Sequence, residues 1–243
     1  MAAEEVADSG MAGATVAAEV AAAGREPAPA DRPGLRREIA DGLRFVAGNR
    51  YLRSIAATTS TANLFGNISR GVFPVFVYVT LGLTPQTVGL IGGGFGAGAL
   101  VGALIGSRVA STFGVGRAIV GAALVFSPAS LLVPLATHDT ALLLIGAGGF
   151  VGSCAATVYN INQVSLRQSI TPEPMLGRMN ATMRFLVWGT IPIGQIIGGL
   201  IATTPLGVIG AVWVGAIGEL LTFLPVLFSS VRSLQTIPEP EPA

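Results

Sequence analysis

Four polar residues interrupt an apolar stretch, residues 54–79, where hydrocarbon would reject them. They are spaced i, i+4, i+8 and i+11, so they share one face of a helix: Thr59, Asn63, Asn67 and Arg70. An unpaired amide in hydrocarbon costs several kcal/mol, and an arginine at depth costs about 2.5–3.5 kcal/mol on insertion scales. The face therefore predicts either hydrogen bonding to a neighbouring helix or the wall of a water-filled cavity.

Glu219 is the one acidic residue deep inside a predicted span. It continues a row of small residues, Gly207, Ala211 and Gly215, at steps of four, so we expect it to face protein. An intramembrane carboxyl group can carry a proton or pair with an arginine. Arg70 is predicted at a comparable depth, and three alternatives stay open: a structural ion pair, ion coupling, or neither.

Further polar candidates lie in two later apolar stretches. Tyr159, Asn162 and Gln163 share a face near one end of residues 140–165, where they could form a gate, anchor a loop or contact substrate. In residues 181–203, Trp188 could anchor at the membrane interface or stack on a ligand. Gln195 comes seven residues later, on the same face of the expected helix. The cavity candidates are Asn63, Asn67, Arg70, Tyr159, Asn162, Gln163, Trp188 and Gln195.

Composition excludes several classes of protein. Hydrophobic residues make up 51% of the 243 and charged residues only 11%, well below the quarter or so of soluble domains, which indicates a membrane protein. A net charge of +1 gives no reason to expect a nucleic-acid partner. One cysteine and one histidine leave neither a metal cluster nor a nucleophile with its base, so we predict no enzyme, no metal and no cofactor.

Six apolar blocks, each near the roughly 20 residues that cross a bilayer, define the expected domains. Residues 1–33 are predicted to be a disordered Ala/Glu/Pro-rich tail, 34–53 an amphipathic juxtamembrane helix, 54–232 the bundle and 233–243 a second disordered tail. The expected spans are 54–79, 86–107, 117–136, 140–165, 181–203 and 207–230.

Arginines predict the orientation of the bundle. They occur before the first span, in the second and fourth connections and after the sixth span, whereas the first, third and fifth connections contain none. Because cytoplasmic loops carry the excess of arginine, we expect both termini in the cytoplasm and a multi-pass protein of the cytoplasmic membrane.

Glycines in the second span recur every four residues and predict close helix packing: Gly94, Gly98, Gly102 and Gly106. The fifth span carries Gly194 and Gly198 at the same spacing. Spans two and five are central in each set of three, and spans one and four both carry polar residues. The pattern suggests a 3+3 inverted repeat of the kind found in transporters.

Two segments carry a family resemblance: "LRREIADGLRFVAGNRYLR" (35–53) and "YNINQVSLRQSITPEPMLGRMNATMRFLVWGTIPIGQIIGGLIA" (159–202). They resemble the C-terminal half of major facilitator superfamily (MFS) transporters, in the enterobactin-exporter-like, multidrug-efflux-like branch. The segment "SRVASTFGVGR" (107–117) is similar to the family's cytoplasmic gating loop. Gly114 and Arg117 match that loop's pattern, whereas Ser111 and Thr112 replace its Asp-Arg pair.

The resemblance implies an all-α membrane protein that forms one six-helix half of a transporter for efflux of small molecules, driven by an ion gradient. Such a half needs a partner, either a missing N-terminal six-helix bundle or a second copy, because the transport site lies between two bundles. The expected chain is thus truncated or one part of a split transporter, with the lipid bilayer and an unidentified small molecule as its other partners. The alternative is a non-transporting membrane bundle, either a scaffold or a decayed remnant.

Overall fold

The computed structural model describes residues 35–236, so the predicted tail 1–33 lies outside the described residues, as do residues 237–243. The chain divides into two compact units after Glu38, and the packed helices belong to the second unit, from Ile39 onward. The described part is helical throughout and contains no strand, which confirms the all-α prediction.

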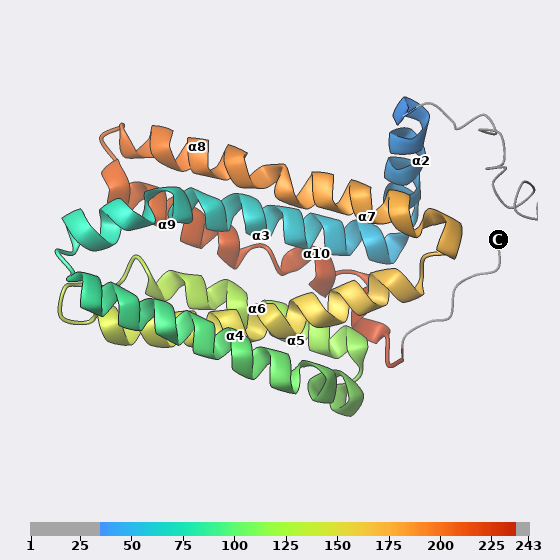
Figure 1. Ribbon diagram of the computed structural model, residues 1–243, viewed down its shortest axis with the longest axis horizontal. Helices are drawn as coiled ribbons and strands as arrows, with labels where there is room; N and C mark the ends of the chain where they lie inside the picture. The colour runs from blue at the N-terminus through green and yellow to red at the C-terminus, as the bar shows by residue number, and fades with distance from the viewer. Residues whose placement is uncertain (1–34, 237–243) are drawn as a thin grey trace, which may run out of the picture. The chain divides into compact units, whose positions relative to one another are not determined.

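Nine α-helices and three shorter helical turns make up the described chain (Figure 1). The α-helices are α2 (Leu35–Gly48), α3 (Arg50–Val75), α4 (Pro85–Phe113), α5 (Val115–Ala129), α6 (Ala141–Ser169), α7 (Glu173–Trp188), α8 (Thr190–Ala202), α9 (Gly207–Leu220) and α10 (Leu224–Leu227). The turns are a π-helix (Phe76–Thr80) and two 3₁₀ helices (Ser130–Leu132 and Ser230–Ser233).

Five helical stretches in the described residues are long and apolar enough to cross a membrane: Pro85–Phe113, Val115–Leu132, Ala141–Ser169, Glu173–Ala202 and Gly207–Leu227. They coincide with the predicted spans two to six. The predicted first span lies in α3, which has 26 residues but whose threonines, serines and asparagines make it too polar to belong to this set.

The predicted juxtamembrane helix, residues 34–53, is divided at Asn49. The Asn49 side-chain oxygen accepts hydrogen bonds from the backbone N–H groups of Tyr51 (3.0 Å) and Leu52 (3.2 Å). An asparagine in this position satisfies the free donors at a helix start. Consequently α2 ends at Gly48, and the first long helix begins at Arg50 rather than at residue 54.

The long helices pack as two groups of three. On one side α6 packs against both α4 and α5, and on the other α3 packs against both α8 and α9 (Figure 1). Glycines make the contacts close: an added Cβ at Gly98 or Gly102 would meet backbone oxygens of α6, and one at Gly194 or Gly198 would meet backbone oxygens of α3.

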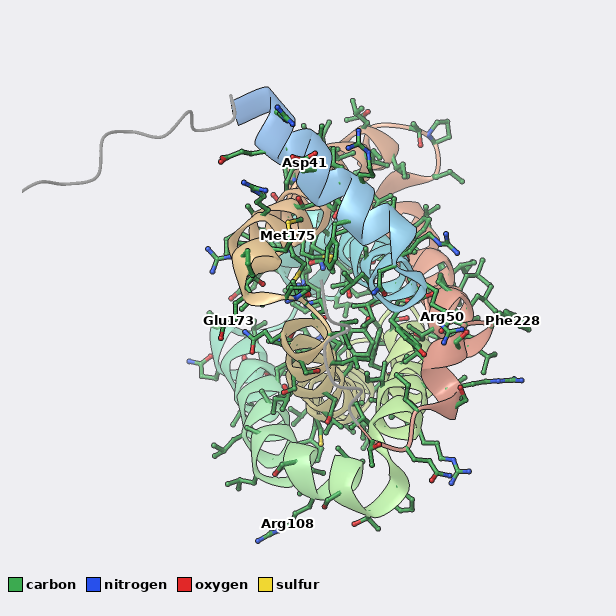
Figure 2. The ribbon with its side chains drawn as sticks, turned by 90° about the vertical axis from the view of Figure 1, so that its right-hand side faces the viewer. Asp41, Arg50, Arg108, Glu173, Met175 and Phe228 are labelled. Carbon is green, nitrogen blue, oxygen red and sulfur yellow. The ribbon has the colours of Figure 1, made fainter. Side chains whose placement is uncertain are left out.

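Charged side chains gather at the end of the bundle where α3 and α7 begin and α4 ends. Asp41, Arg50, Arg108 and Glu173 all lie there (Figure 2). The same end holds the last described residues, because Gly116 donates its backbone N–H to the Leu234 carbonyl at 2.9 Å. Leu234 and Gln235, which fall within the predicted tail 233–243, thus contact the start of α5, and residues 237–243 lie outside the described residues.

Candidate substrate cavity

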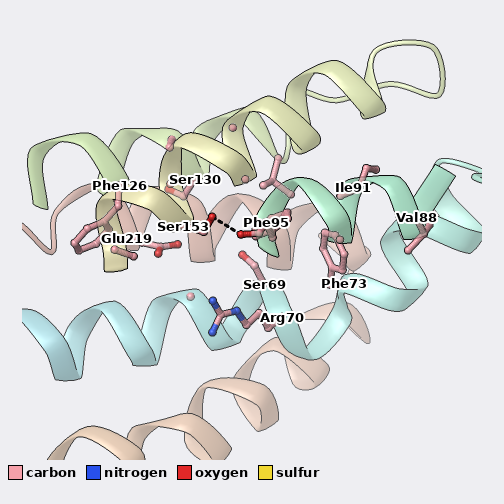
Figure 3. A pocket seen from close by; sticks show the side chains of 18 residues that line it. Ser69, Arg70, Phe73, Val88, Ile91, Phe95, Phe126, Ser130, Ser153 and Glu219 are labelled. Atoms are coloured by element: carbon pink, nitrogen blue, oxygen red, sulfur yellow. Dashed lines mark hydrogen bonds between the residues drawn. The ribbon is translucent and has the colours of Figure 1, made fainter. Parts of the chain in front are cut away.

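A cavity of about 360 Å³ lies between the two groups of helices (Figure 3). Helices α3 and α9 form one side, and α4, α5 and α6 form the other. The lining is mostly apolar, and it contains five charged or hydroxyl-bearing side chains: Ser69, Arg70, Ser130, Ser153 and Glu219.

Arg70 of α3 and Glu219 of α9 both lie on this cavity (Figure 3). Glu219 lies beside Gly66, where an added Cβ would be 3.5 Å from the nearer carboxylate oxygen. Arg70 and Glu219 form no direct salt bridge, because no guanidinium nitrogen of Arg70 lies within 4.0 Å of a Glu219 carboxylate oxygen. The cavity thus presents two opposite charges that do not neutralise each other by contact.

Both charged residues stand where a helix becomes irregular. Pro74 has no N–H to donate to the carbonyl of Arg70, and the helix changes to a π-helix at Phe76. Helix α9 ends at Leu220, one residue after Glu219, and the chain turns before α10 begins. Irregular backbone at membrane depth is tolerated where it is buried in protein or lines a cavity.

The three serines use their hydroxyl protons within the protein. Ser69 donates to the Val212 carbonyl (3.2 Å), Ser153 to the Phe95 carbonyl (2.7 Å) and Ser130 to the Ser127 carbonyl (2.7 Å). Their oxygens can still accept a hydrogen bond, but Arg70 and Glu219 remain the strongest groups for a polar ligand.

Aromatic rings give the cavity its apolar walls. Phe73, Phe95 and Phe126 come from α3, α4 and α5, and the sequence analysis singled out none of them (Figure 3). The one available signal was the small-residue run "GAGGFVGS" at 146–153, where an added Cβ at Gly149 would meet the Phe95 ring. Which rings converge depends on helix packing that no local pattern encodes.

The α3 amides do not line this cavity. Asn63 donates its side-chain N–H to the Thr59 carbonyl (2.9 Å), and Asn67 donates to the Asn63 carbonyl (2.7 Å). Asn67 is 3% exposed and packs beside Gly194 of α8. Of the predicted polar face, Arg70 alone reaches the cavity.

The α6 candidates connect helices. The Tyr159 and Thr59 hydroxyls are 2.9 Å apart, which joins α6 to α3. Asn162 donates to the Gly106 carbonyl of α4 at 3.1 Å. Gln163 donates to Asn160 at 2.8 Å, while its side-chain oxygen is buried with no hydrogen-bond partner among the described residues. All three predicted residues lie outside the cavity lining.

The remaining candidates lie at the protein surface. Trp188 is 62% exposed, with the Arg184 guanidinium 5.7 Å from its ring centre. Gln195 is exposed on α8, where its backbone lies next to Gly71. Gly114 makes the one-residue connection between α4 and α5 with a φ of +89°, and Arg117 is exposed just after it.

Comparison with known proteins identifies the family of this chain. A family model described as transmembrane secretion effector, within the MFS, matches residues 14–240. Comparisons with curated proteins and with solved structures each find no match. The superfamily consists of membrane transporters rather than enzymes. Because the match covers nearly the whole sequence, the chain belongs to the transmembrane secretion effector family of the MFS.

Proposed function

We propose that the chain is one six-helix bundle of an efflux transporter for small amphipathic molecules, driven by an ion gradient. The observation that carries the proposal is the apolar cavity with Arg70 and Glu219 on its walls. A ligand with an apolar body would contact the three phenylalanine rings, and its polar group would meet one of the two charges.

The packing pattern supports a 3+3 repeat within this bundle. In such a repeat α3 corresponds to α6, α4 to α8 and α5 to α9. The contact of α4 with α6 then corresponds to the contact of α8 with α3. The contact of α5 with α6 then corresponds to that of α9 with α3, and all four contacts are present. Such a repeat requires α3 as the first of six spans, and α8 and Tyr159 of α6 contact its polar face.

Glu219 is the proposed ion-coupling residue. It is the acidic residue among those that line the cavity, and an intramembrane carboxyl group can bind and release a proton. Arg70 on the neighbouring helix α3 would respond to that change in charge without being bonded to Glu219. Binding of a ligand and binding of a proton would then compete within one cavity.

Transport is tested by loading cells with a fluorescent amphipathic compound and measuring its efflux rate. The chain is expressed alone and together with any six-helix reading frame encoded immediately upstream. Gly92 lines the cavity, Gly93 does not, and an added Cβ at either position meets no atom within 4 Å. We expect Gly92→Leu to slow efflux at least ten-fold and Gly93→Leu to leave the rate unchanged.

The same assay separates coupling from binding. Glu219→Gln should make the remaining efflux insensitive to an uncoupler that collapses the proton gradient, while Arg70→Ala should slow efflux and leave that sensitivity intact. Equal rates for the two leucine variants would exclude the cavity from the transport route. No efflux by the wild type in either expression format would favour a non-transporting bundle.

A further inference from the structure

A second hollow lies on the outer surface of the bundle, away from the substrate cavity. It has a volume of about 490 Å³ and runs between α4 and α5, with α6 as its floor. Its lining is apolar apart from Arg117 and the thiol of Cys154. We call it the α4–α5 groove.

The groove follows from the connection at Gly114. A single residue joins α4 to α5, so the two helices start side by side at that end. Each of them contacts α6 far more extensively than it contacts the other, which leaves a space between them. Arg117 lies in the first turn of α5, at the closed end of this space.

The dimensions of the groove match one membrane leaflet. Its lining covers 105–113 of α4, 117–125 of α5 and 150–158 of α6. At 1.5 Å per residue each of these segments is about 12 Å long, slightly less than half of a hydrocarbon core about 30 Å thick. The groove can therefore hold much of an acyl chain.

The side chains at the base of the groove are buried and those at its rims are exposed, as expected for a site that binds a lipid from the membrane. Ala118 (3%) and Val158 (5%) are buried at its base, whereas Phe113 (61%) and Val151 (46%) are exposed at its rims. Arg117 is exposed and has no hydrogen bond or ion pair within the described residues. A guanidinium at the end of an apolar groove complements the anionic phosphate headgroup of a phospholipid whose acyl chain lies in the groove.

We propose that the α4–α5 groove binds one acidic phospholipid of the cytoplasmic leaflet, with an acyl chain between α4 and α5 and the phosphate on Arg117. The lipid would fix the angle between these helices from outside the bundle. Nothing in this inference depends on transport by the inner cavity.

The experiment measures phospholipid bound to the purified chain by native mass spectrometry, using an equimolar mixture of phosphatidylglycerol and phosphatidylcholine. We expect the wild type to hold one phosphatidylglycerol in preference to phosphatidylcholine. Arg117→Gln should weaken phosphatidylglycerol binding about five-fold, the effect of one arginine near an anionic surface. The matched control is Arg108→Gln, which removes an exposed arginine outside the groove and should change nothing.

A second pair of variants tests the acyl-chain site. Gly121 lines the groove, and a Cβ added there meets no atom within 4 Å. Gly121→Leu should abolish the bound lipid, and Gly121→Ala should retain it, with similar unfolding temperatures for both. Equal binding of the two lipids, an equal effect of Arg108→Gln, or a chain dimer that Gly121→Leu dissociates would each overturn the proposal.

Discussion

Single residues show how this protein accommodates polar groups at membrane depth. Asn63, Asn67 and Asn162 each donate to the carbonyl four residues earlier, which satisfies a side-chain donor inside its own helix. Such back-bonding lowers the cost of an amide in hydrocarbon. A polar face on a membrane helix is thus compatible with tight packing and does not by itself mark a solute path.

Tyr159→Phe tests whether a single hydroxyl contact joins the two halves of the bundle. It removes the hydrogen bond to Thr59 and keeps the edge-to-face ring contact with Phe126. We expect the free energy of unfolding in detergent to fall by about 1 kcal/mol. Tyr78→Phe is the control, since Tyr78 is 45% exposed. Equal losses for the two variants would show that the Thr59 bond contributes nothing.

Elements in this fold approach one another through glycine. On α4, Gly98 is buried against the Phe150 carbonyl of α6, while Gly96 is exposed with open space around its Cα. The same helix therefore contains glycines with opposite roles. Only the packing distinguishes a glycine that permits helix contact from one that merely lowers helix propensity.

Gly98→Ala and Gly96→Ala make this difference measurable. The first places a methyl group onto backbone of α6, so we expect a loss of about 1–3 kcal/mol in the free energy of unfolding. The second replaces a poor helix former in open space and should stabilise by up to about 1 kcal/mol. Thermal unfolding in detergent gives both values, and a change of the same sign in both variants would contradict the assignment.

At the scale of the whole molecule, charge is distributed unequally between the two ends of the bundle. One end carries Arg50, Arg108 and Arg117, whereas the connections at the other end, including the one with His138, contain no arginine. The His138 ring donates a hydrogen bond from Nδ1 to the Leu81 carbonyl at 2.8 Å, which links two of those connections. The arginine-rich end is the expected cytoplasmic end.

Cysteine labelling in intact cells checks this orientation. In a Cys154→Ala background no other cysteine remains in the chain. We expect a membrane-impermeant maleimide to label Asp139→Cys in intact cells and Ser111→Cys only after the cells are permeabilised. Both positions are exposed, Asp139 in the connection between α5 and α6 and Ser111 in the last turn of α4, at opposite ends of the bundle. The reverse pattern would invert the bundle in the membrane.

The sequence by itself determined what depends on neighbours along the chain. Hydropathy and length located the helices that can cross a membrane, glycine spacing identified the contact face of α4, and segment 159–202 indicated the superfamily. Local errors came from competing local signals: the Asn49 cap started α3 earlier than hydropathy indicated. These features are readable because helix periodicity repeats within a few residues.

Only the tertiary structure decided where the cavity and the groove lie. Gly66 and Glu219 are far apart in sequence and meet because α9 packs on α3, and the three phenylalanines converge from three helices. Polar spacing placed Arg70 and Asn67 on one face of α3, but it could not show that Arg70 lines the cavity while Asn67 packs on α8. The sequence of one helix determines which residues share a face, whereas the packing of all the helices determines what that face contacts.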